Sequence, residues 1–141
     1  MARVVLDTSV VATAFRSNQG AGFALLRAVR FGLLRALATP TLFLEYEDVL
    51  KRPDQRQVSK LSLADVDRAL DALAALIEPV EVHVQWRPQL RDPGDELVFE
   101  AAINGRADAL VTYNVRDFRD AASRFGIRIV RPAELLSEIL Q

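Results

Sequence analysis

The run Val4-Val5-Leu6-Asp7-Thr8-Ser9 is the most informative part of the sequence, because an apolar segment ends there in a carboxylate that two hydroxyl residues follow. β-Branched and aliphatic residues in succession predict a buried strand. A carboxylate at the end of such a strand faces the crevice in which open α/β sheets bind ligands. Burying this charge alone is costly, so we expect Asp7 to meet a metal ion, a cation or a set of donors. The alternative is that Asp7 only caps the helix that follows.

Segments with the pattern of strands and segments with the pattern of helices alternate along the chain. The predicted strands are residues 2–6, 35–38, 80–84, 109–112 and 127–130. The predicted helices are residues 9–16, 21–34, 40–50, 62–77, 95–104 and 132–140. This alternation predicts an α/β fold with a central, mainly parallel sheet, helices on both faces and right-handed crossovers. The chain of 141 residues has no repeat and no long linker, which predicts one domain over residues 1–141.

Capping and turn signals mark several of the predicted helix ends. Thr39-Pro40 has the residue types of an N-cap and a first helical position. Ser62 and Asp65 have the spacing of a capping box. Asp92-Pro93-Gly94-Asp95 is a turn that leads into a helix, and we expect Gly105 to end that helix in the left-handed conformation.

The composition limits the classes of partner and site. A formal net charge of −1 provides no general attraction to nucleic acid or acidic membranes, so nucleic-acid binding requires a local patch. The absence of cysteine excludes disulfides, thiol catalysis and cysteine–metal sites. Together with the lack of a secretory leader, it predicts a cytoplasmic protein. No apolar stretch is long and charge-free enough to span a bilayer, so no membrane association is expected.

Four acidic residues are predicted to meet at one edge of the sheet. They are Asp7 at the end of the first strand, Glu45 within a helix, Asp95 in the first turn of a later helix, and Asp117 after a late strand. Strand ends and helix starts gather at the same edge of a parallel sheet. A carboxylate cluster repels itself unless cations hold it, and Mg²⁺ and Mn²⁺ prefer oxygen ligands. Such ions activate water and stabilise charge on a phosphoryl group, so the predicted chemistry is phosphodiester hydrolysis.

Each acid also has a purely structural interpretation. A solvated helix position would account for Glu45, and a favourable charge at a helix N-terminus would account for Asp95. A turn cap would account for Asp117. The order of the acids along an alternating strand and helix pattern favours a shared site over these separate roles.

Four motifs taken together resemble those of PIN domains. They are Val4-Val5-Leu6-Asp7-Thr8-Ser9, Glu45 in a helix that ends at Val49-Leu50, Arg91-Asp92-Pro93-Gly94-Asp95-Glu96, and Val111-Thr112-Tyr113-Asn114-Val115-Arg116-Asp117-Phe118. The chain is most similar to the branch of the VapC ribonucleases, which are toxins of toxin–antitoxin systems. The resemblance implies a Rossmann-like three-layer sandwich and a Mg²⁺- or Mn²⁺-dependent endoribonuclease acting on RNA. It also implies a homodimer and a cognate antitoxin protein that inserts a side chain into the active site.

Carried over residue by residue, the resemblance implies that Asp7, Glu45 and Asp95 are catalytic and metal-binding acids. The fourth position departs from the family pattern, because Asn114 stands where many members have aspartate. Asparagine is neutral and a weaker ligand. Asp117 is therefore the candidate that completes the site from one helical turn further on.

Hydroxyl and amide residues next to the acids are the candidates for supporting roles. The resemblance implies that Thr8 or Ser9 orients Asp7 or a bound water by hydrogen bonding. Thr112 and Asn114, at the end of a late strand, are the further supporting candidates.

Arginines near the predicted acids are candidates for phosphate contacts with RNA, which supply affinity without reading bases. Arg91, Arg116 and Arg119 are the principal candidates, and Arg124 and Arg128 extend the rim. The alternative is ordinary solvated surface. The single histidine, His83, is expected on the surface, and Trp86 is expected to pack against the core or a subunit partner rather than to stack on a base.

A second interpretation is a catalytically degraded PIN-like domain that acts as a protein- or RNA-binding module. Asn114 favours this interpretation, because a neutral amide weakens the metal site. A metal titration separates the two, since a degraded site binds Mn²⁺ poorly and cleaves no RNA.

Overall fold

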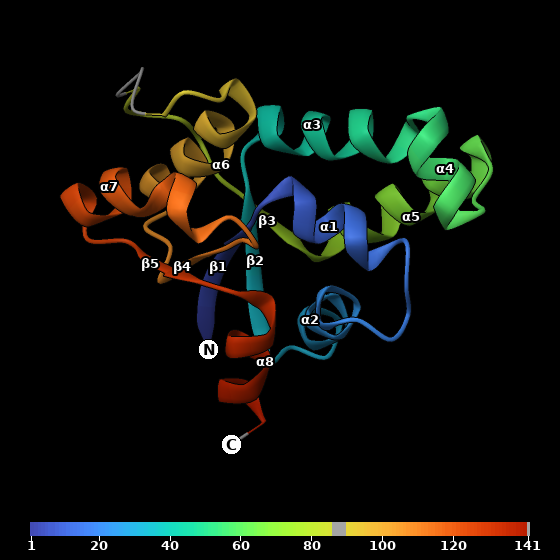
Figure 1. Ribbon diagram of the computed structural model, residues 1–141, viewed down its shortest axis with the longest axis horizontal. Helices are drawn as coiled ribbons and strands as arrows, with labels where there is room; N and C mark the ends of the chain where they lie inside the picture. The colour runs from blue at the N-terminus through green and yellow to red at the C-terminus, as the bar shows by residue number, and fades with distance from the viewer. Residues whose placement is uncertain (86–89, 141) are drawn as a thin grey trace.

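A sheet of five parallel strands forms the centre of the protein in the computed structural model, which describes residues 1–85 and 90–140 (Figure 1). The strands are β1 (Ala2–Leu6), β2 (Leu34–Ala38), β3 (Ile77–Pro79), β4 (Ala109–Val111) and β5 (Arg128–Val130). The helices are α1 (Thr8–Ala14), α2 (Ala21–Arg30), α3 (Pro40–Lys51), α4 (Pro53–Ser59), α5 (Leu63–Leu76), α6 (Pro93–Asn104), α7 (Val115–Phe125) and α8 (Pro132–Ile139). The predicted α/β class with a parallel central sheet is confirmed.

The strand order is β3-β2-β1-β4-β5, with β1 in the middle. In register, Val4 of β1 pairs with Ala36 of β2 on one side and with Ala109 of β4 on the other. The chain therefore leaves β1 toward one edge of the sheet and later returns to build the other half. The gap between the ends of β1 and β4 is a topological switch point, where open α/β sheets bind ligands.

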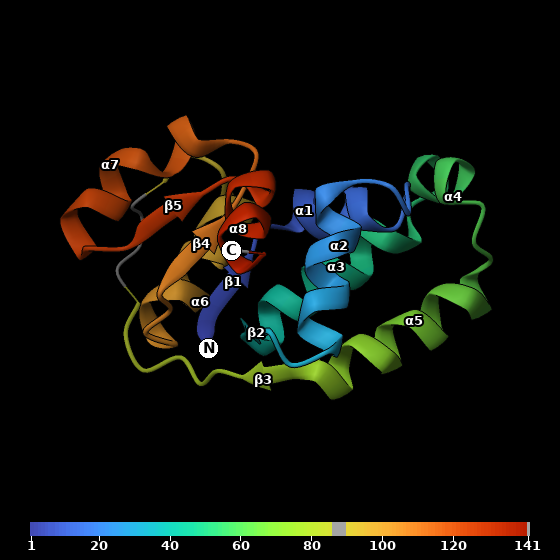
Figure 2. The same ribbon diagram turned by 90° about the horizontal axis from the view of Figure 1, so that it is seen from below.

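Helices cover both faces of the sheet and form three layers with it (Figure 2). On one face α6 contacts β1, β2 and β4, and α7 lies beside it against β5. On the other face α1 packs on α2, and α2 packs on α8. The middle strands are consequently covered on both sides, so Val4, Val5 and Leu110 are completely buried. This explains why the first strand is continuously apolar instead of alternating.

The predicted helix starts at Thr39 and Ser62 are confirmed. The Thr39 side chain accepts a hydrogen bond from the backbone N–H of Leu42 (3.1 Å), with Pro40 at the first helical position. Ser62 and Asp65 form both bonds of a capping box. These caps satisfy donors that have no partner inside the helix.

The strand predicted at residues 80–84 is wrong, and β3 lies just before it. Ile77 pairs with Ala36 as soon as α5 ends, and β2 itself ends at Ala38 because α3 begins there. The last three residues of β2, Ala36 to Ala38, are therefore already paired with β3 before the alternating segment begins. Asn104 of α6 instead holds that segment, since its side chain bonds the N–H of His83 and both backbone groups of Val84.

Two predicted helix ends differ from the structure. The helix predicted over residues 21–34 ends at Arg30, because Gly32 turns the chain with a φ of 78° before β2 begins. Gly105 does not take the left-handed conformation, which Arg106 adopts with a φ of 50°. Glycine is needed at position 105 for space, since a Cβ there would lie 2.9 Å from the carbonyl oxygen of Ala101 and 3.0 Å from Val80.

Two helices, α4 and α7, lie outside the predicted elements. The α4 helix uses Pro53 at its first position, where proline is tolerated, so the proline that ends α3 also starts the next helix. In α7 the buried side is narrow and consists of Phe118, Ala121 and Ala122. No helix in the described residues has the length and hydropathy required to cross a membrane. The packing expected of Trp86 concerns a residue outside the described ranges.

Candidate active site

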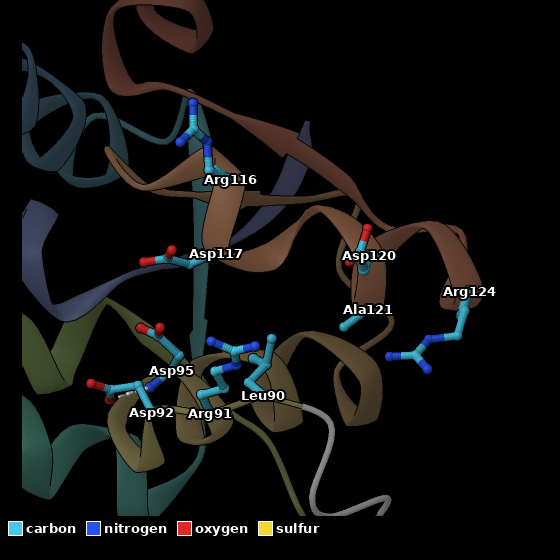
Figure 3. A pocket seen from close by; sticks show the side chains of 9 residues that line it. All are labelled: Leu90, Arg91, Asp92, Asp95, Arg116, Asp117, Asp120, Ala121 and Arg124. Atoms are coloured by element: carbon cyan, nitrogen blue, oxygen red, sulfur yellow. Dashed lines mark hydrogen bonds between the residues drawn. The ribbon is translucent and has the colours of Figure 1, made fainter.

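A cleft with a volume of about 510 Å³ opens beside the ends of the central strands, between the start of α6 and one side of α7 (Figure 3). It is lined by Leu90, Arg91, Asp92, Asp95, Arg116, Asp117, Asp120, Ala121 and Arg124. Acidic and basic side chains make up most of this lining. Asp7 lies next to it at the end of β1, near enough for its charge to act on Asp95.

Asp7 is only 5% exposed and is held by hydroxyl groups. Its Oδ2 accepts hydrogen bonds from Ser9 Oγ at 2.9 Å and from Thr112 Oγ1 at 2.7 Å. Although Asp7 occupies the N-cap position of α1, its side chain makes no capping hydrogen bond. The capping alternative therefore does not account for this carboxylate. The carboxylate is oriented by Ser9 of α1 and by Thr112, which directly follows β4.

The supporting candidates Thr112, Asn114 and Thr8 differ in what they contact. Thr112 is completely buried, and its hydroxyl also accepts the N–H of Asn114 at 2.9 Å, which joins the start of α7 to Asp7. The Asn114 side chain is exposed and makes no capping bond to α7. The Thr8 hydroxyl oxygen is buried and has no hydrogen-bond partner among the described residues.

Tyr46 of α3 forms a hydrogen bond to the end of β1, and it was not among the predicted site residues. It is 1% exposed, and its hydroxyl donates to the backbone carbonyl of Leu6. Burial, followed by the nearby charge of Asp7, raises the pKa of Tyr46 far above its usual range, so the phenol stays protonated. The sequence feature that could have indicated this role is the position of the tyrosine on the buried side of α3, between Leu42 and Leu50. A buried tyrosine hydroxyl needs a hydrogen-bond partner.

Asp95 lies in the first turn of α6. The turn before it is closed by Asp92, whose Oδ1 accepts the N–H groups of Gly94 at 2.7 Å and of Asp95 at 3.2 Å. Burial raises the pKa of Asp95 to about 7, and the charges of Asp7, Asp92 and Asp117 add to this shift. The negative charges of three other acids therefore all act on the Asp95 carboxyl group.

Asp117 and Glu45 reach the same region from different elements. Asp117 lies in the first turn of α7, and its carboxylate faces the same part of the cleft as that of Asp95 (Figure 3). Glu45 is half-buried on α3, and its Oε1 lies 3.7 Å from where a Cβ of Gly94 would be. The fold therefore brings Asp7, Asp95 and Asp117 together and places Glu45 beside the start of α6.

The arginines divide into two groups. Arg91, Arg116 and Arg124 line the cleft, but the Arg116 side chain points away from Asp95 (Figure 3). Arg119 is exposed and does not line the cleft, because two residues along a helix from Asp117 correspond to about 200° of rotation. Arg128 is the first residue of β5 and so lies at the end of the strand that faces away from the cleft, where it pairs with Glu138. His83 is exposed beside Glu81 at 3.6 Å, as expected of a surface residue.

The donor set suits a hard divalent cation. Carboxylate oxygens are the ligands that Mg²⁺ and Mn²⁺ prefer, and both hydroxyl bonds to Asp7 use Oδ2, so no described residue donates to Oδ1. As the side chains stand, no three acidic or histidine side chains of the described residues form a ready metal-binding group. Mutual repulsion of uncompensated carboxylates is expected to hold them apart, and this repulsion adds to the burial that raises the pKa of Asp95.

The raised pKa of Asp95 predicts how the stability of the metal-free protein depends on pH. An unfolded chain releases this proton near the ordinary value of 3.8, whereas the folded protein keeps it up to about pH 7. The folded state therefore binds more protons in this interval, and its stability falls as the pH rises from about 4 to about 7. Thermal unfolding in EDTA should show that Asp95→Asn lacks this decline relative to wild type. Parallel pH profiles of the two proteins would contradict the prediction.

Known proteins resemble this chain in sequence and in fold. The family model described as PIN domain matches residues 3–116. Among solved structures, VapBC2 from Rickettsia felis bound to a DNA fragment from its promoter is similar, with a TM-score of 0.59 and 14% sequence identity. That match covers 92% of this chain and 98% of the other and concerns the fold alone. No curated protein sequence gave a significant match.

Proposed function

The chain belongs to the PIN domain family, and from this premise we propose that it is a Mg²⁺- or Mn²⁺-dependent endoribonuclease that hydrolyses RNA phosphodiester bonds. PIN domains are generally nucleases that use divalent metals, which makes hydrolysis of nucleic acid the expected reaction. The observation that carries the proposal is the convergence of carboxylates on Asp95, whose pKa is about 7, at the switch point of the sheet. We treat residues 1–141 as one nuclease domain.

Asp7, Asp95 and Asp117 would hold the metal ion, with Glu45 as a further acid beside the start of α6. The bound ion would supply an activated water and a positive charge for the phosphoryl oxygens. Ser9 and Thr112 keep Asp7 in one orientation by donating to the same oxygen. Because Asp7 is already oriented, binding of a cation would not require free energy to reorient this side chain.

The arginines would contact the RNA backbone. Arg91 and Arg124 extend into the cleft beyond the acids, and Arg116 and Arg119 lie on α7 nearer its exposed side. Guanidinium groups bind phosphate through two hydrogen bonds, so they compensate locally for a chain whose net charge is −1. This distribution supports binding of a phosphate neighbouring the one that is cleaved.

The cellular role we propose is the toxin component of a toxin–antitoxin pair in the cytoplasm, with a cognate antitoxin protein as partner and a homodimer as the assembly. Support comes from the likeness of the fold to VapBC2 of Rickettsia felis, whose structure was determined with promoter DNA. A PIN-like domain without turnover is the alternative function. Asn114 at the usual position of an acid favours it, as does the lack of a ready metal-binding group of three acidic side chains among the described residues.

Cleavage of a mixed RNA pool by the purified protein tests the proposal. We expect cleavage in Mn²⁺, none in EDTA, and little cleavage of a matched pool of single-stranded DNA. Calorimetry of Mn²⁺ binding should accompany the assay. Absence of both cleavage and Mn²⁺ binding would favour the binding module, whereas equal cleavage of RNA and DNA would overturn only the specificity for RNA.

A further inference from the structure

Tyr113 is an exposed aromatic residue next to the acidic site. Among the described aromatic side chains only Tyr113 and Phe31 are exposed, at 37% and 66%. Phe31 lies just before β2, at the edge of the sheet opposite the cleft. Tyr113 instead follows Thr112, the residue that donates to Asp7, and precedes α7. An aromatic surface therefore adjoins the proposed reaction centre without belonging to the hydrophobic core.

Tyr113 is held in place by hydrogen bonds at its hydroxyl group and at its backbone carbonyl. Thr13 Oγ1 donates to the carbonyl of Val10 at 3.0 Å, so its single proton is used. The Tyr113 hydroxyl, 3.2 Å from Thr13 Oγ1, must then be the donor of that pair. At the backbone, the Tyr113 carbonyl accepts Arg131 Nη1 at 2.9 Å. A ring fixed through its hydroxyl and its main chain loses little conformational freedom when a ligand binds.

The position of Thr13 is itself constrained by packing. A Cβ on Gly22 would lie 3.2 Å from Thr13 Oγ1 and 2.9 Å from the Val10 carbonyl, so α2 approaches α1 closely at this point. Thr13 follows Asp7 by six residues along α1, which is about 9 Å at a rise of 1.5 Å per residue. The anchor of the ring is thus rigid and lies within reach of a nucleotide whose phosphate is at the acids.

We propose that Tyr113 is a stacking platform for a base of single-stranded RNA, adjacent to the phosphate that is cleaved. Every base has a π-face, so stacking tolerates different sequences and positions the strand rather than reading it. The acids then lie between an aromatic surface on the α1 side and the arginines of the cleft, Arg91 before α6 and Arg124 on α7. A strand would be held through a base on one side of the scissile bond and through phosphate on the other. This inference rests on the proposed ribonuclease function.

The test removes the ring and the base separately. In the Asp95→Asn background, for which the proposed function predicts no cleavage, fluorescence anisotropy measures binding of a labelled RNA decamer of adenylate and of an abasic ribose-phosphate decamer with the same charge. Tyr113→Ala should weaken binding of the adenylate decamer about five- to tenfold and leave binding of the abasic decamer unchanged. Tyr113→Phe keeps the ring and should retain most of the affinity, and Phe31→Ala is the matched control for loss of an exposed ring.

The outcomes distinguish this inference from the proposal on which it rests. An equal loss on both decamers would indicate a structural role for Tyr113 and overturn the stacking role, while leaving the ribonuclease function intact. Unchanged binding of both decamers by Tyr113→Ala would overturn it as well. Failure of the Asp95→Asn protein with intact Tyr113 to bind either decamer, together with no cleavage by wild type, would reject both proposals.

Discussion

Asparagine in place of Asp7 is expected to lower Mn²⁺-dependent RNA cleavage by about 100- to 1000-fold, the loss typical when one preorganised electrostatic group is removed. The substitution removes the charge that would bind the cation and keeps the shape of the side chain. An amide oxygen at the place of Oδ2 can still accept the hydroxyls of Ser9 and Thr112. The loss should therefore appear in kcat and in Mn²⁺ affinity, and not in the fold.

Asp71→Asn is a suitable control, because it makes the same chemical change at an exposed position of α5, away from the cleft. We expect wild-type cleavage from this variant and matching circular dichroism spectra from all three proteins. Asp7→Asn removes one of the repelling charges around Asp95, so the metal-free variant should unfold at no lower temperature than wild type. Full cleavage by Asp7→Asn would show that the reaction does not use this acid.

Alanine in place of Phe118 is expected to lower the free energy of unfolding by about 3–5 kcal/mol. Phe118 is completely buried, and with Ala121 and Ala122 it forms the narrow apolar side by which α7 attaches to the rest of the protein. A loss of this size is a large part of the roughly 5–15 kcal/mol that stabilises a typical domain. Because Asp117 precedes Phe118 and Arg124 lies further along α7, cleavage should fall together with stability.

Urea unfolding followed by circular dichroism measures this effect. Phe31→Ala provides the matched control, since Phe31 is 66% exposed and its truncation should change stability by no more than about 0.5 kcal/mol. Similar small effects of both substitutions would mean that α7 is not anchored through Phe118. The position of Asp117 in the cleft would then need another explanation.

The middle strands β1 and β4 were predictable because local pattern and final burial agree. The apolar run before Asp7 and the short run at residues 109–112 both become middle strands covered on two sides. A strand buried on both faces has no polar side to interrupt its pattern, so its sequence identifies it directly. The caps at Thr39 and Ser62 were predictable for a similar reason, since each satisfies donors within three residues.

The errors arise where distant contacts decide between local alternatives. Alternating valines predict a strand at residues 80–84, yet Ile77 has already paired with Ala36, and Asn104 binds the backbone of the next segment. Gly105 matches a left-handed helix end but is required because Val80 and Leu37 pack against it. Neither contact can be read from neighbouring residues.

Residue types and their spacing within one element were enough to predict the alternation of strands and helices, the family motifs and the acids at strand and helix ends. Tertiary structure alone decided which groups act on one another. Thr112 reaches Asp7 only because β4 pairs with β1, and burial among three other acids raises the pKa of Asp95 to about 7. The assembled fold also determines that Arg124 lines the cleft while Arg119 does not, and that the Tyr113 hydroxyl bonds to Thr13. Charge interactions and hydrogen bonds depend on distance in space, and that distance is set when the sheet assembles.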